Sequence, residues 1–172
     1  MRDLANEQKI FEFFKLLGRR VRSEVRVYIT GGATAVLTGW RDTTVDIDLR
    51  FEPEVDELFR ALPELKEKLW LNIELAAPSD FIPPLPGWKE RSLFIGREGR
   101  INFYHYDPYS QALAKIERGH EKDLLDVAAM FEREMIEREK LLELFESIKP
   151  QLYRYPAIDP TSFSNAVDRA VG

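Results

Sequence analysis

Apolar residues recur along the chain with two different periods, and these periods predict an alternation of helices and strands. Residues 4–17 carry apolar side chains at the spacing of a helix with one buried face. Residues 25–29 (VRVYI) are rich in β-branched and aromatic residues, which favours a buried strand. Residues 45–51 and 71–75 alternate between apolar and polar side chains, as strands with one face turned to a core do. The apolar positions of the first helix are Ile10, Phe11, Phe14 and Leu17.

Between and after these strands the pattern indicates further elements. A short helix is predicted over 33–37. A longer helix over 54–70 is expected to break or restart at Pro63, because proline removes a helix hydrogen bond. Residues 92–95 and 101–106 flank a turn and predict a β-hairpin.

From residue 108 onward the pattern is helical, with helices predicted over 109–118, 122–134 and 139–148. The order of elements predicts an α/β (α+β) protein with a small mixed sheet, flanking helices and a helical C-terminal third. We expect a single domain over residues 1–172. Its three parts are a sheet core at 20–106, C-terminal helices at 107–150 and an irregular tail at 151–172.

Composition and charge narrow the class of protein. The 172 residues are 44% hydrophobic and 32% charged, an ordinary balance for a globular chain. No apolar run is long enough to cross a bilayer, and charges precede the first apolar stretch, so we expect a cytoplasmic protein with no membrane partner. The net charge of −5 disfavours broad binding to nucleic-acid backbones, but it permits a nucleotide held through metal ions. The absence of cysteine excludes disulfides, zinc–thiolate sites and thiol nucleophiles.

Two glycines, Gly31 and Gly32, separate the first strand from the short helix. Glycine lets a ligand approach the backbone closely, and free N–H groups at a helix start favour an anion such as phosphate. A tight strand-to-helix turn without a ligand explains the same residues. Arg41 and Thr44, which precede the next strand, also have two interpretations: contact with a phosphate or base, and an ordinary polar loop.

Three carboxylates lie on the polar faces of two predicted strands. Asp46 and Asp48 are two residues apart, so their side chains leave the same face about 6–7 Å from each other. Two carboxylates in one space are stable only with a cation between them or with ample water. Mg²⁺ that also binds phosphates prefers hard oxygen ligands of this kind. Glu74 joins the pair if the strands at 45–51 and 71–75 are neighbours, and a solvated polar face is the alternative for all three residues.

The two histidines do not indicate a metal site. His105 lies between two tyrosines on a predicted strand, where a packed histidine is the simpler interpretation, and His120 is expected at the surface. With two histidines and no cysteine, a zinc enzyme is disfavoured. Residues 81–88, which include three prolines and a tryptophan, fit a lid and a rigid connector equally well.

The glycine pair, the Asp-Ile-Asp-Leu segment at 46–49 and the Ile-Glu-Leu segment at 73–75 together resemble the DNA polymerase β-like nucleotidyltransferase superfamily. The resemblance covers roughly residues 20–130. The spacing is similar to that of compact bacterial members, which include minimal nucleotidyltransferases and abortive-infection toxins paired with antitoxins. A helix lysine, Lys115, followed by acidic residues at 123 and 126, is similar to the toxin-like branch.

The resemblance implies transfer of a nucleoside monophosphate from a nucleoside triphosphate to a hydroxyl, with two Mg²⁺ ions that Mn²⁺ can replace. It implies that Asp46, Asp48 and Glu74 bind the metals and that Glu74 assists deprotonation of the acceptor. The resemblance also implies nucleotide-binding residues, which are Gly31, Gly32, Arg41, Thr44 and Lys115. It implies two auxiliary residues, Asp123 and Asp126.

Each helper residue also has a structural interpretation. Lys115 fits a solvated helix lysine, Asp123 fits a helix start favoured by the macrodipole, and Asp126 fits an ion pair with Lys122.

Three hypotheses stay open. The first is an active nucleotidyltransferase whose acceptor is a protein, a tRNA or a small molecule, in a toxin–antitoxin context or outside one. The second is a catalytically retired member that serves as a binding or regulatory partner. The third is a different α/β scaffold in which the acidic strand is only a polar face. A homodimer and a complex with a partner protein both fit the sequence.

Overall fold

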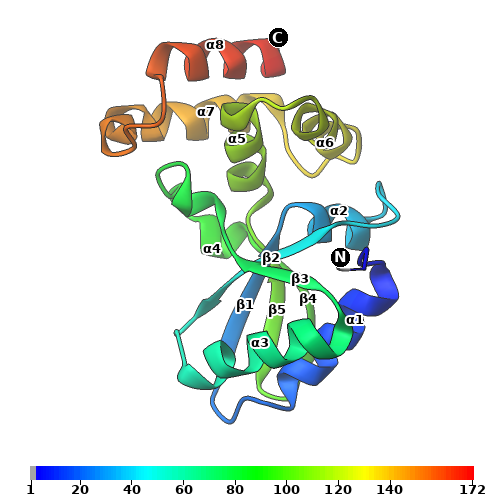
Figure 1. Ribbon diagram of the computed structural model, residues 1–172. Coiled ribbons are helices and arrows are strands. Elements are labelled where there is room, and N and C mark those ends of the chain that lie inside the picture. Colours follow the sequence, from blue (N-terminus) through cyan, green and yellow to red (C-terminus); the bar gives the residue numbers. More distant parts are fainter. Residues whose placement is uncertain (1–2) are drawn as a thin grey trace. The chain divides into compact units, whose positions relative to one another are not determined.

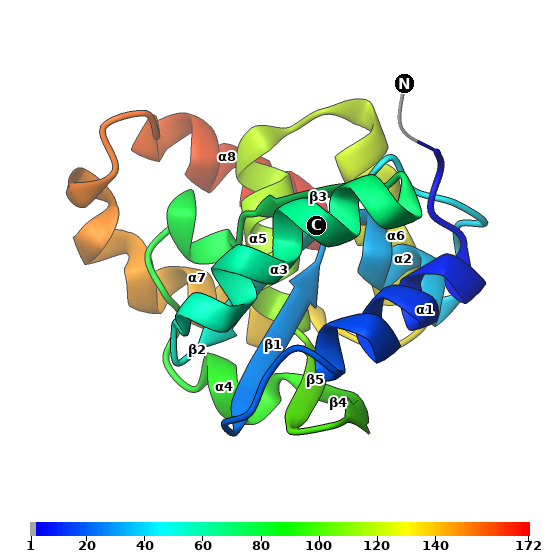
Figure 2. The ribbon, with the colours of Figure 1, turned by 60° about the horizontal axis from the view of Figure 1, so that its bottom comes forward.

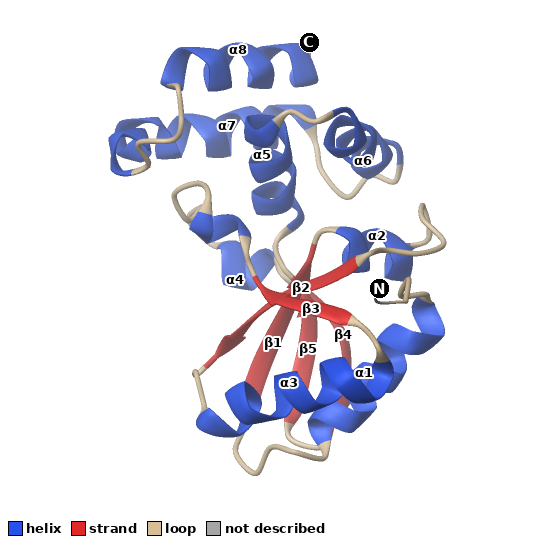
Figure 3. Cartoon of the chain, in the orientation of Figure 1, coloured by secondary structure: helices blue, strands red, loops and turns tan. Residues whose placement is uncertain are grey.

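A computed structural model of the protein describes residues 3–172 and shows a mixed five-stranded sheet with helices (Figures 1 and 3). This confirms the predicted α/β class. The strands are β1 (Val25–Thr30), β2 (Asp46–Glu52), β3 (Asn72–Leu75), β4 (Leu93–Glu98) and β5 (Ile101–His105). The α-helices are α1 (Glu7–Gly18), α2 (Gly32–Thr38), α3 (Asp56–Leu69), α4 (Trp88–Arg91), α5 (Pro108–Arg118), α6 (Glu121–Glu132), α7 (Arg138–Ile148) and α8 (Pro160–Val171).

The chain divides into two compact units. The sheet unit contains the described residues up to Ala77 together with Leu93–His105. The helical unit contains Pro78–Ser92 and Tyr106–Gly172, so the proline-rich segment belongs with the C-terminal helices.

The strand order in the sheet is β3-β2-β1-β5-β4. β1 pairs antiparallel with β2 and parallel with β5, β2 pairs parallel with β3, and β4 pairs antiparallel with β5. β1 is therefore a central strand, which agrees with its nearly continuous apolar sequence. β3 and β4 form the two edges.

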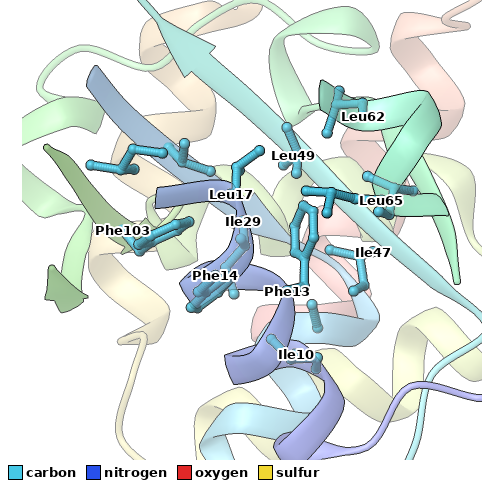
Figure 4. Packing of buried hydrophobic residues seen from close by; sticks show 14 of the residues in the cluster. Ile10, Phe13, Phe14, Leu17, Ile29, Ile47, Leu49, Leu62, Leu65 and Phe103 are labelled. Carbon is cyan, nitrogen blue, oxygen red and sulfur yellow. The ribbon is translucent and has the colours of Figure 1, made fainter. Parts of the chain in front are cut away.

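Helices α1 and α3 cover one face of the sheet (Figure 2). Apolar side chains of both helices meet those of the strands in one buried cluster (Figure 4). Phe14 of α1 stacks on Phe103 of β5, with ring centroids 4.0 Å apart. On β2, Ile47, Leu49 and Phe51 enter this core, so the alternate residues of the strand must leave on the opposite face.

Several details of the sheet unit differ from the sequence prediction. The buried face of α1 contains Phe13, which lies at i+3 from Ile10 on the same side of the helix, while Phe11 is 43% exposed. Helix α3 is continuous through Pro63, where a break was predicted. The apolar residues on its core-facing side offset the hydrogen bond that proline removes. Val45 precedes β2 and is exposed.

The predicted irregular tail is wrong for its second half, because residues 160–171 form helix α8. Asp159 caps this helix by accepting a hydrogen bond from the Thr161 amide at 3.2 Å. Pro160 stands at the first helical position, which proline favours, and Phe163 and Val167 are buried one turn apart.

We expect Phe13→Ala to lower the free energy of unfolding by about 3–5 kcal/mol, because it leaves a cavity at a fully buried position. Phe11→Ala, on the exposed side of the same helix, is the matched control, and its expected loss is below about 1 kcal/mol. Urea denaturation followed by circular dichroism measures both. Equal losses in the two variants would contradict this assignment of the helix faces.

Candidate functional site

Pairing of β2 with β3 brings the three predicted carboxylates to one face of the sheet. In the parallel register Asp48 lies opposite Glu74, and Asp46 lies opposite Asn72. Residues paired across neighbouring strands project from the same face, and here that face is opposite the buried Ile47 and Leu49. Asp46 and Asp48 are half-buried, and Glu74 is exposed.

Asn72 links two of these carboxylates. Its side-chain amide donates hydrogen bonds to Oδ1 of Asp46 and, at 3.2 Å, to Oε1 of Glu74. An amide donates two N–H groups and carries no charge, so it holds two acids near each other without neutralising them. Sequence reasoning did not select Asn72 as a site residue, although its place on the polar face of the same strand as Glu74 was the available signal.

The glycine pair packs directly against other predicted site residues. Gly31 has φ +68°, which favours glycine, and a Cβ there would lie 3.2 Å from Oδ2 of Asp48. A Cβ on Gly32 would lie 1.9 Å from Oγ1 of Thr44 and 3.5 Å from Nη1 of Arg41. The positive φ therefore favours glycine at position 31, and the close approach of Thr44 requires glycine at position 32.

Thr44 also fixes the start of the acidic strand. Its hydroxyl donates to the backbone carbonyl of Asp46 at 3.1 Å. Its backbone exchanges two hydrogen bonds with Ala5, at 2.8 and 2.9 Å, which joins the loop before β2 to the segment before α1. The backbone that leads into Asp46 is therefore held by the Thr44 hydroxyl and by the hydrogen bonds to Ala5.

The carboxylates of this face fit a magnesium ion that takes its other oxygen ligands from elsewhere. Within residues 3–172 no group of three or more His, Cys, Asp or Glu side chains is placed so that it could hold a metal ion by itself. Mg²⁺ bound with a nucleotide needs only one or two protein carboxylates, because phosphates and water supply the other oxygens. Asp46 and Asp48, on one face of one strand, are a donor set of this kind.

The other three predicted helpers form a buried ion-pair cluster within the helical unit. Nζ of Lys115 on α5 lies 2.8 Å from Oδ2 of Asp126 and 3.8 Å from Oδ1 of Asp123, both on α6. Nε of Arg118 donates to Asp123 at 2.7 Å. Burial raises the pKa of Asp123, but the hydrogen bond and charge of Arg118 and the charge of Lys115 outweigh it, and the pKa is lowered. The cluster joins α5 to α6.

The histidines lie where the sequence placed them. His105 is half-buried at the end of β5, and its Nδ1 lies 3.1 Å from Oγ1 of Thr34 on α2. Burial lowers the pKa of His105 to about 4, so the ring is neutral at neutral pH. His120 is exposed.

The proline-rich segment is attached to α5 within the helical unit. Arg91 donates to both carboxylate oxygens of the fully buried Asp107, at 3.1 and 2.8 Å. Asp107 also caps α5 by accepting from the amide of Tyr109 at 3.1 Å. Trp88 stacks on Tyr106 with ring centroids 4.3 Å apart. These contacts hold the end of the segment firmly on its own unit.

A mixed sheet whose glycine corner lies beside an acidic pair on the next strand is consistent with a nucleotidyltransferase-like fold. A family model described as "nucleotidyltransferase of unknown function" (DUF6036) matches residues 7–159, and the chain belongs to this family. Neither the curated proteins nor the solved structures contain a match to the chain. Among the described helices, none has the length and apolar character needed to cross a membrane.

Lys115→Ala is expected to lower the free energy of unfolding by about 3–5 kcal/mol, because it removes the cation that lies 2.8 Å from the buried carboxylate of Asp126. Lys122→Ala, at an exposed position of α6, serves as the control and stays within about 0.5 kcal/mol of wild type. Chemical denaturation at neutral pH measures both. A Lys115→Ala protein as stable as wild type would show that the cluster is not structural.

His105 predicts a specific acid sensitivity. Its folded pKa of about 4 lies below the usual value near 6.5, so its contribution to stability is complete above pH 6.5 and is lost as the pH falls toward 4. Between pH 7 and pH 5 the wild type should lose about 1–2 kcal/mol more stability than His105→Gln. Parallel pH profiles for the wild type and His105→Gln would refute this.

Proposed function

We propose that the protein transfers a nucleoside monophosphate from a nucleoside triphosphate to a hydroxyl acceptor, at the acidic face of β2 and β3. The observation that carries the proposal is the strand register that sets Asp48 opposite Glu74 and beside Asp46. Membership of a nucleotidyltransferase family supports the reaction class.

In this proposal Asp46 and Asp48 hold Mg²⁺, or Mn²⁺ in its place, and Glu74 completes the site. Ions held by these two carboxylates would supply positive charge at the reacting phosphate. Glu74, exposed at the edge of the sheet, accepts the proton of the acceptor hydroxyl. The new bond joins the acceptor oxygen to the α-phosphorus, and the bond to the bridging oxygen breaks, which releases pyrophosphate.

The residues at the glycine corner bind the polyphosphate. The proposed contact is with backbone N–H groups of the Gly31–Gly32 turn where α2 begins, because Asp48 and Thr44 already occupy the space beside the two Cα atoms. Arg41, whose Nη1 approaches Gly32, supplies positive charge, and Thr44 positions the loop. Lys115 can contribute to phosphate binding only if it leaves Asp126 and Asp123, so we assign these three residues a supporting structural role first.

The acceptor is a protein, a tRNA or a small molecule, and a toxin–antitoxin context agrees with the family resemblance. A retired binding partner of the same fold is the second candidate. Two observations favour it: the Asn72 amide already occupies oxygens of Asp46 and Glu74, and Lys115 is held in ion pairs.

Incubation of the protein and a cell lysate with each α-labelled triphosphate and Mg²⁺ tests the proposal. We expect label on the acceptor with wild type and a loss of at least about a hundredfold in Asp48→Asn. Asp42→Asn, at an exposed position of the loop before β2, is the matched control and should keep full activity.

Isothermal titration with each triphosphate and Mg²⁺ separates the two candidates. Triphosphate binding without any transfer would favour the retired partner. Absence of both binding and transfer with all four triphosphates would overturn the proposed function.

A further inference from the structure

The helical unit contains a cavity of about 550 Å³ that the proposed reaction does not use. Helices α5, α6, α7 and α8 all contribute to its lining, and every lining residue belongs to the helical unit. The cavity is therefore a feature of this unit alone.

The walls of the cavity are largely apolar. On α6, Leu124, Ala128 and Phe131 follow one another at helical spacing and line one wall. On α8, Ala166 and Ala170 lie one turn apart and line another. Their small side chains leave room that larger residues would fill. Leu124 remains 46% exposed, so this apolar surface is not closed off by the unit's own core.

The charged residues of the lining are two arginines, Arg138 and Arg169, and one glutamate, Glu132. Arg138 is held in place: its Nη1 donates to the carbonyl of Ala170 at 3.0 Å, and its guanidinium lies 4.6 Å from the ring centre of Phe131. One hydrogen bond leaves most of its N–H donors available. Arg169 has no ion-pair partner among residues 3–172, and the lining carries a net positive charge.

We propose that this cavity binds a small amphipathic anion, with an alkyl or aromatic body on the apolar walls and one carboxylate, sulfonate or phosphate group at Arg138 and Arg169. An uncharged apolar ligand leaves both cations without a counter-ion, and a hydrophilic anion leaves the apolar walls in contact with water. Only a molecule with both parts satisfies both surfaces. The site is separate from the acidic face of the sheet unit and has its own ligand.

Straight-chain carboxylates below their micellar concentrations test the site, with isothermal titration as the readout. Decanoate should bind, and each methylene added from hexanoate to decanoate should tighten binding about fourfold, the value for burial of one CH₂. Decanol and decylammonium have the same body without the anion and should bind at least about tenfold more weakly. Equal affinity for decanoate and decanol would refute the anion site, and no binding of decanoate at millimolar concentration would refute the cavity as a ligand site.

Variants locate the binding. Ala128→Trp and Ala166→Phe fill the cavity from opposite walls, and both should abolish decanoate binding. Leu125→Trp, at an exposed α6 position outside the lining, is the matched control and should bind as wild type does.

Arg169→Gln should weaken decanoate about tenfold and leave decanol unchanged, while Arg154→Gln, outside the lining, should change neither. Circular dichroism and a melting curve establish that each variant folds. Folded cavity-filling variants that still bind decanoate would overturn the proposal. A dimer that decanoate does not dissociate would also overturn it, because a second copy of the chain would then occupy this surface.

Discussion

The alternation of β2 between core and open face is the constraint on which the candidate site depends. Ile47 and Leu49 are fully buried beneath α1 and α3, and this packing fixes which residues leave on the other side. A shift of one residue would turn Asp46 and Asp48 into the apolar core, where an ionised carboxylate without a partner is very costly. The same apolar contacts that stabilise the sheet unit therefore orient its acids.

Local periodicity in the sequence was enough to predict the fold class, the order of the strands along the chain and the acidic face of β2. The face of α1 and the continuity of α3 through Pro63 could not be predicted in this way, since tertiary contacts decide them. Helix α8 was missed because two prolines suggested irregular structure, although Asp159-Pro160 is a typical helix start. The carboxylate link through Asn72 depends on the pairing of β3 with β2, which no local pattern specifies.

Charged groups are used differently in the two units. In the sheet unit, Asp46 and Glu74 accept hydrogen bonds from the side-chain amide of Asn72, which carries no charge. In the helical unit, Lys115 and Arg118 neutralise Asp123 and Asp126 inside the protein. A charge that is already compensated by its neighbours contributes to the packing of α5 on α6, whereas an uncompensated one is available for a cation. This contrast is the reason to place the reaction on the sheet.

The glycine corner has a consequence for how members of this family diverge. The positive φ of Gly31 favours glycine, and Thr44 approaches Gly32 so closely that a methyl group there would collide with it. Steric exclusion of this kind acts on every folded copy, whether or not it performs chemistry, while the proposed function needs the aspartates only in a copy that does. Under the proposed function, a relative that keeps both glycines but replaces Asp46 would preserve the scaffold without the reaction.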